Sequence, residues 1–125
     1  MKEVIATNDG PKAIGPYSQA IKANGFLFVS GQIAIDPVTN TLVSGDVSFQ
    51  TDRVLKNLSG ILKAAGSGLE KVVRSTVFLK NMTDFNGMNE VYGRYFSSEP
   101  PARSTVEVAR LPKDVLVEID VVALA

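Results

Sequence analysis

The stretch PPARSTVEVARLPKDVLVEIDVVAL, residues 100–124, decides the fold prediction. Apolar and polar residues alternate over 103–109 and again over 115–124, a pattern typical of strands with one buried face. Residues 111–114 contain a proline and an aspartate, which favour a turn between the two segments. The stretch is therefore predicted to fold as a β-hairpin.

The predicted hairpin brings two charged side chains close together. With a four-residue loop at 110–113, Thr105 lies opposite Glu118, and Arg103 lies diagonally from Glu118. Diagonal neighbours are about 7 to 8 Å apart, within reach of a long side chain. One interpretation is a cross-strand ion pair. The other is a site in which both groups bind one small ligand, since a carboxylate in so apolar a strand is costly unless it is paired or used.

Length and charge favour one ordinary domain over residues 1–125. The chain is 45% hydrophobic and 21% charged, which is enough apolar material for one core. Thirteen basic and thirteen acidic residues cancel, and the basic ones are scattered. Because nucleic-acid affinity comes mainly from clustered cations, RNA or DNA binding is not expected.

Cysteine and histidine are both absent. This excludes a disulfide, a thiolate nucleophile, a serine–histidine triad and a zinc site with the usual ligands. Catalysis would have to use carboxylates, hydroxyls, arginine or lysine, backbone amides and water, so no metal or cofactor is expected. The sequence shows neither a signal peptide nor an apolar run long enough for a bilayer, and the predicted location is the cytoplasm.

The first third of the chain predicts strands separated by turns. Asn24 and Gly25 form a strong hairpin signal, and the glycines and prolines of residues 8–16 indicate a structured loop leading to Tyr17. Gly31 can bring the backbone close to another group because it has no side chain. The strands are expected at 3–7, 18–23 and 26–30, and residues 34–46 are expected to be irregular.

Two helices and one further strand follow. Asp46 is predicted to cap a helix that ends near residue 65, and Asp84 to cap a second helix, with a strand at 71–80 between them. Both helices repeat apolar residues at helical spacing, and Asn89 lies among those of the second helix, where a buried amide must find partners. The apolar faces consist of Val54, Leu58, Ile61, Leu62 and Ala65, and of Phe85, Met88, Tyr92, Tyr95 and Phe96.

This order predicts an α+β fold with a single mixed sheet and both helices on one face. Residues 115–124 are apolar on both faces of the strand, yet the chain has no further element to cover the second face. A homo-oligomer that buries this face is therefore expected.

Three segments carry a resemblance to a known family. The runs GPYSQAI at 15–21, VSGQI at 29–33 and PPARSTVEVARLPKDVLVEID at 100–120 resemble the Rid family of imine and enamine deaminases, also described as translation inhibitors and L-PSP endoribonucleases. The resemblance implies a chorismate-mutase-like fold of the Bacillus type. It also implies a homotrimer whose sheets form a central barrel, with sites at the subunit interfaces.

The resemblance also implies roles for single residues. Arg103 matches the arginine that binds a substrate carboxylate, and Glu118 the acid that positions or activates water. Further residues match the substrate pocket, namely Tyr17, Ser30, Gly31, Asn89 and Thr105. Thr105 stands where many members carry cysteine, so thiol chemistry is excluded while water addition is retained. Each of these pocket residues also has a purely structural interpretation, as a packing, turn or strand residue.

The expected activity is cofactor-independent hydrolysis of 2-imino or 2-enamino acids, such as 2-aminoacrylate and 2-iminopropionate, to 2-ketoacids and ammonia. A planar guanidinium suits the carboxylate, and a carboxylate suits the proton of the attacking water. Two alternatives stay open. The first is a small-carboxylate-binding regulator or chaperone, and the second is an endoribonuclease or translation inhibitor.

Overall fold

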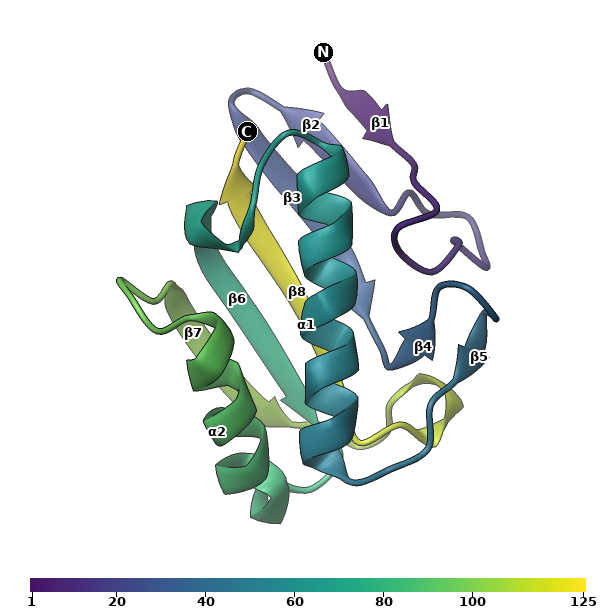
Figure 1. Ribbon diagram of the computed structural model, residues 1–125, viewed down its shortest axis with the longest axis vertical. Coiled ribbons are helices and arrows are strands. Elements are labelled where there is room, and N and C mark those ends of the chain that lie inside the picture. Colours follow the sequence, from purple (N-terminus) through teal and green to yellow (C-terminus); the bar gives the residue numbers. More distant parts are fainter.

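The computed structural model describes residues 1–125 and contains one six-stranded sheet, a small two-stranded sheet and two long helices (Figure 1). Short 3-10 turns occupy 69–71, 82–84 and 112–114. The α+β class with one main mixed sheet is confirmed. The elements are β1 (Glu3–Ile5), β2 (Ala20–Ala23), β3 (Phe26–Gln32), β4 (Ile35–Asp36), β5 (Thr41–Leu42), α1 (Val47–Ala64), β6 (Val72–Leu79), α2 (Phe85–Tyr95), β7 (Ala102–Glu107) and β8 (Val117–Leu124).

The predicted C-terminal hairpin is wrong. The strand order of the main sheet is β1-β2-β3-β8-β6-β7, so β6 lies between β7 and β8 (Figure 1). β7 pairs with β6 in parallel, and β8 pairs antiparallel with both β3 and β6. The physical reason is the β6–α2–β7 order, because a crossover helix returns the chain to the same sheet in parallel.

The connection from β7 to β8 is also longer than a hairpin turn. It runs over residues 108–116 and contains Lys113 and Asp114, both with positive φ angles of 55° and 56°. Val108 still donates to the carbonyl of Leu79 on β6, and Lys80 donates to the carbonyl of Leu116. The segment therefore passes over the end of β6 instead of reversing directly.

The true strand pairing changes which side chains share a face. Thr105 pairs with Val77, which is buried beneath the helices, whereas Glu118 pairs with Phe78 on the opposite face. Side chains in register across a sheet point to the same side. Arg103, two residues before Thr105, lies on the helix face. Arg103 and Glu118 of one chain are therefore separated by the sheet, and the predicted pairing across a hairpin is excluded.

Local signals were interpreted correctly in several places. The Asp46 side chain accepts from the backbone N–H of Phe49 at 2.9 Å and caps α1. Asn24 and Gly25 have φ angles of 52° and 82°, as the tight turn between β2 and β3 requires.

Two other local predictions differ from the structure. Asp84 does precede α2, but its side chain makes no capping hydrogen bond. The segment predicted to be irregular at 34–46 contains the short hairpin β4–β5.

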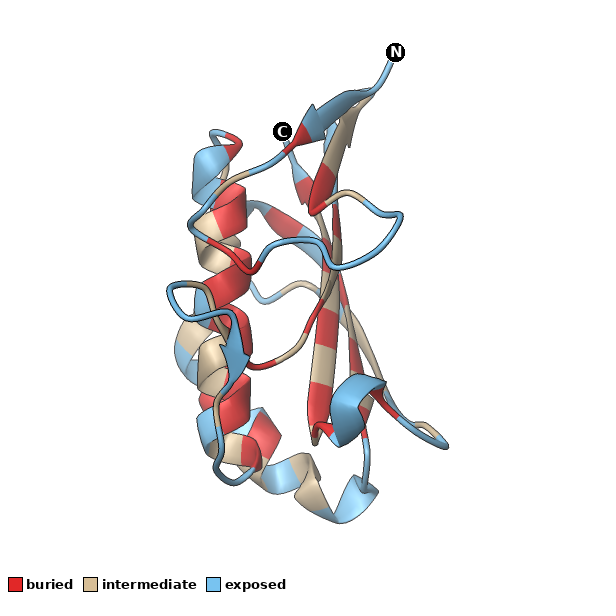
Figure 2. Ribbon diagram, turned by 90° about the vertical axis from the view of Figure 1, so that its right-hand side faces the viewer, coloured by how far each residue is buried: buried red, intermediate tan, exposed pale blue.

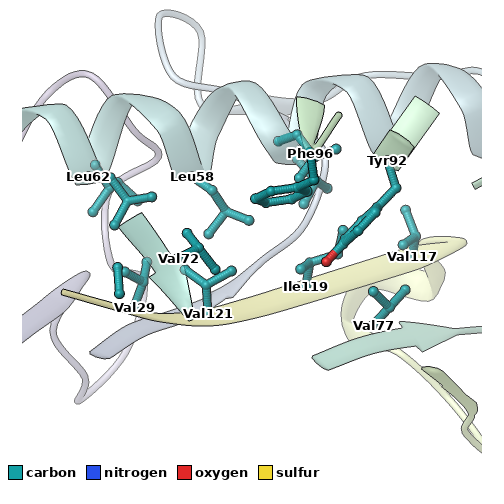
Figure 3. Packing of buried hydrophobic residues seen from close by; sticks show 14 of the residues in the cluster. Val29, Leu58, Leu62, Val72, Val77, Tyr92, Phe96, Val117, Ile119 and Val121 are labelled. Carbon is teal, nitrogen blue, oxygen red and sulfur yellow. The ribbon is translucent and has the colours of Figure 1, made fainter. Parts of the chain in front are cut away.

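The core lies between the helices and the inner face of the sheet. Figure 3 shows Leu58 and Leu62 of α1, Tyr92 of α2 and Phe96 just after α2, above valines and an isoleucine of the strands. Leu58, Leu62 and Ile119 are fully buried. The predicted apolar faces of both helices are confirmed, except that Tyr95 and Phe85 are only partly buried against this core.

The outer face of the sheet has no cover within the chain. Both helices pack on the same side, and the other side is largely open (Figure 2). Large apolar side chains remain exposed on this face, among them Val4, Phe26, Phe28, Val106 and Leu124. The uncovered apolar face is therefore a property of the folded chain. Neither helix is long and apolar enough to cross a membrane.

Candidate functional site

A cleft of about 380 Å³ opens where the loop after β1 meets the end of β3. Four residues predicted for the site lie along it: Tyr17, Ser30, Gly31 and Glu118. The remaining lining residues are mostly apolar and include one cation: Pro11, Lys12, Ile14, Gln32, Ile33, Ile35 and Pro112. The cleft thus combines an apolar wall with one carboxylate, as small-molecule sites commonly do.

Residue 31 must be glycine because there is no room for a side chain at this position. The pairing of β3 with β8 is irregular between Val29 and Gln32, and this bulge brings the Gly31 backbone against the Glu118 side chain. A Cβ atom at residue 31 would overlap Glu118 Oε2. The sequence prediction that Gly31 permits a close approach is confirmed, and the group that approaches is the candidate catalytic carboxylate.

Gly31→Ala is expected to retain the fold and reduce activity, because the overlap is with the free end of a flexible side chain. Displacing a reacting group by about 1 Å can lower a rate roughly a hundredfold. The measurement is the rate of the reaction that the family resemblance implies, beside thermal unfolding. A Gly31→Ala variant with full activity would show that the position of the Glu118 side chain does not affect the rate. The control is Gly25→Ala, which introduces backbone strain at a distant turn.

Glu118 has no ionic partner in its own chain. It is half-buried, makes no ion pair, and burial raises its pKa above the ordinary value, with a further increase from the nearby charge of Asp120. Burial also raises the pKa of Asp120, although a hydrogen bond from Thr76 and the charge of Arg74 partly offset this. A carboxylate with a raised pKa in a cleft is suited to accept a proton.

Two buried side-chain amides that were not predicted from the sequence, Gln19 and Asn57, hold the walls of the cleft. The Gln19 side chain accepts from Thr7 N at 2.6 Å and donates to Pro11 O at 2.7 Å, which fixes the loop that leads to Tyr17. Asn57 is fully buried and donates to Ile35 O at 2.8 Å. Asn57 lies on the apolar face of α1, and this signal was available in the sequence.

Tyr17 and Ser30 are joined to the same loop. The Tyr17 hydroxyl accepts from the backbone N–H of Ile14 at 3.3 Å. The residue is 48% exposed, which disfavours a core role. The Ser30 hydroxyl donates to the carbonyl of Ser18 at 2.6 Å. Both side chains therefore shape the cleft through contacts with its own loop.

The other three predicted residues form a second group, on the helix face near the edge strand β7. Arg103 Nη1 donates to Asn89 Oδ1 at 2.8 Å, and Thr105 follows on the same face of β7. Asn89 is exposed, so its prediction as a buried amide is wrong. Arg103 has no carboxylate partner, and the buried Thr105 hydroxyl has no hydrogen-bond partner. This half of the predicted site is separate from the cleft.

Comparison with known proteins gives one consistent family. Residues 7–125 match the family described as endoribonuclease L-PSP. A RutC family protein of Pyrococcus horikoshii is 59% identical, with 98% of each chain covered. Reactive Intermediate Deaminase A of Arabidopsis thaliana, a chloroplastic protein, is 48% identical, over 98% of this chain and 65% of its own length. The crystal structure of Escherichia coli TdcF with bound serine is 40% identical and superposes with a TM-score of 0.93, covering 98% of each chain.

Proposed function

The chain belongs to the endoribonuclease L-PSP (Rid) family and has a reactive-intermediate deaminase among its relatives, and we propose that it hydrolyses 2-imino and 2-enamino acids to 2-ketoacids and ammonia. The expected substrates are small, such as 2-iminopropanoate and 2-iminobutanoate. Serine bound to TdcF supports a ligand of amino-acid size with a carboxylate. Addition of water to an imine and release of ammonia need no cofactor.

The observation that carries this proposal is the unpaired Glu118 carboxylate in an apolar cleft. Glu118 accepts a proton from water while the water oxygen bonds to the imine carbon, and the π electrons of the C=N bond move to nitrogen. That proton passes to the nitrogen and gives a carbinolamine. Glu118 then moves the proton of the new hydroxyl group to the amine, the C–O bond becomes a carbonyl as the C–N bond breaks, and ammonia leaves a ketoacid. General acid–base assistance of this kind contributes roughly 10²- to 10⁴-fold in rate.

Arg103 supplies the complementary charge from a second copy of the chain. Within one chain the sheet separates Arg103 from Glu118, and each lacks an ionic partner. We infer that neighbouring copies pair them in a trimer, where the uncovered sheet faces pack into a central barrel. A guanidinium binds a carboxylate through two hydrogen bonds and would orient the imine toward Glu118. The unpartnered Thr105 hydroxyl supports a ligand or partner at the same place.

The test is a coupled assay in which an amino-acid oxidase generates imines in situ. Ketoacid release is measured with semicarbazide as a competing trap, with and without the protein, for several amino acids. The expected result is faster ketoacid formation with the wild type and background rates with Arg103→Ala. An unchanged rate with wild-type protein would reject deamination. Saturable ketoacid binding without turnover would favour the regulatory alternative.

RNA cleavage is the second candidate, because the matching family is described as an endoribonuclease. Its chemical support is weaker, since the cleft has one lysine and no histidine, and the chain carries no net charge. Incubating the same preparations with RNA decides the matter. Cleavage that disappears in both Glu118→Gln and Arg103→Ala would assign RNA to this site.

A further inference from the structure

Arg103 rests on one face of α2. Its guanidinium carbon lies 4.6 Å from the ring centroid of Tyr92 and 5.6 Å from that of Phe85, while Nη1 donates to Asn89. These three α2 residues are spaced four and three apart, so they share one side of the helix. Two aromatic faces and one amide oxygen therefore surround the cation without any neutralising carboxylate.

Tyr92 is itself held firmly. Only 5% of it is exposed, and its hydroxyl shares a 2.5 Å hydrogen bond with the hydroxyl of Ser75, which is fully buried on β6. The ring centroid of Phe96 lies 4.6 Å from that of Tyr92, and Figure 3 shows both rings side by side above Ile119. Burial raises the Tyr92 pKa, so the ring stays neutral near pH 7. Arg103 thus lies on an aromatic surface that is fixed to both the helix and the sheet.

We propose that Tyr92 is a positioning residue for the reaction. Its buried ring holds the Arg103 guanidinium in the orientation that binds the substrate carboxylate. This inference rests on the proposed function. The guanidinium of an arginine has five N–H donors. Within the chain, Arg103 donates a hydrogen bond only from Nη1, to Asn89, so donors remain for a bidentate contact with a carboxylate. A neutral ring orients the cation without competing for those donors, whereas a carboxylate would occupy them.

Tyr92→Leu is expected to raise KM, and the Kd for the product ketoacid 2-oxobutanoate, by roughly 3- to 30-fold, the range for a lost cation–π contact. The rate kcat should change less than KM, because the proposed general base, Glu118 of a neighbouring copy, is unaltered by the substitution. Tyr92→Phe keeps the ring and loses the Ser75 hydrogen bond. The Tyr92→Phe variant should therefore unfold at a lower temperature yet keep a nearly wild-type KM. If Tyr92 served stability alone, KM would rise together with the loss of stability.

Tyr95→Leu is the matched control. Tyr95 lies on the same helix, but its hydroxyl donates to Asp52 of α1, away from Arg103. It should lose stability without raising KM. If Tyr92→Leu does not fold, Phe85→Leu tests the same contact at a half-buried position and should raise KM by a smaller factor.

The outcomes separate this inference from the proposed function. An inactive wild type that binds no 2-oxobutanoate would reject deamination at this site. An active wild type with an unchanged KM in Tyr92→Leu and Phe85→Leu would overturn the positioning role alone. A KM that rises equally in Tyr95→Leu, or in step with lost stability in Tyr92→Phe, would also overturn it.

Discussion

Co-assembled Arg103→Ala and Glu118→Gln chains are expected to regain about one quarter of the wild-type activity, although each variant alone is nearly inactive. In a closed ring, each site would take Glu118 from one copy and Arg103 from the next. With random one-to-one assembly, each of these positions is intact in half of the sites, so about one site in four is complete. The opposite placement of the two side chains on one sheet is the structural reason.

The measurement requires subunits to mix, by co-expression with two different tags or by joint refolding. The control pairs Arg103→Ala with the double variant Arg103→Ala/Glu118→Gln, a mixture in which no intact Arg103 exists. Activity restricted to the first mixture supports a site shared between copies. If proven mixed oligomers recover no activity, the site is not shared between copies. Arg103 would then have to act without Glu118.

Glu118→Gln is expected to lower kcat by roughly 10²- to 10⁴-fold, the contribution of a positioned general base. KM should change much less, because Arg103 still binds the substrate carboxylate. Glutamine keeps the size and polarity of the side chain, so the fold and assembly should survive. The measurement is steady-state ketoacid release, with Asp120→Asn as the control for a neighbouring carboxylate. A variant with a wild-type kcat would remove Glu118 from the mechanism.

The same substitution should affect stability with a defined pH dependence. Burial raises the pKa of Glu118 in the folded chain, so between the unfolded and folded pKa values the folded state binds more protons. Stability therefore falls as pH rises through this window and stays lower above it. In Arg103→Ala chains, where no guanidinium can offset the effect, Glu118→Gln should raise the melting temperature at pH 7. The gain should vanish below the unfolded pKa of about 4.3. A lower melting temperature at pH 7 would contradict the assigned direction.

Short-range signals explain most of the correct predictions. Asp46 can cap α1 whatever surrounds it, and Asn24 with Gly25 can form a tight turn, because both depend on a few neighbouring residues. The buried face of α1 follows from its 3.6-residue period alone. The grouping of Tyr17, Ser30, Gly31 and Glu118 came from resemblance to a family, and their juxtaposition in one cleft needed the folded chain.

Strand alternation shows that Arg103 and Thr105 share one face of their strand, and that Glu118 and Asp120 share one face of theirs. It does not show whether these two faces lie on the same side of the sheet. That relation depends on strand pairing, and a shift of one residue reverses it. The sequence order of β7 and β8 favoured a hairpin, whereas the crossover through α2 placed β6 between them.

The amino-acid order therefore specifies the helices, the turns and the chemical groups available to this protein, because these follow from local geometry and residue type. Assembly of the sheet determines where the groups lie. It sends the carboxylate of Glu118 and the guanidinium of Arg103 to opposite sides, because long-range pairing of backbone hydrogen bonds selects the neighbours of each strand.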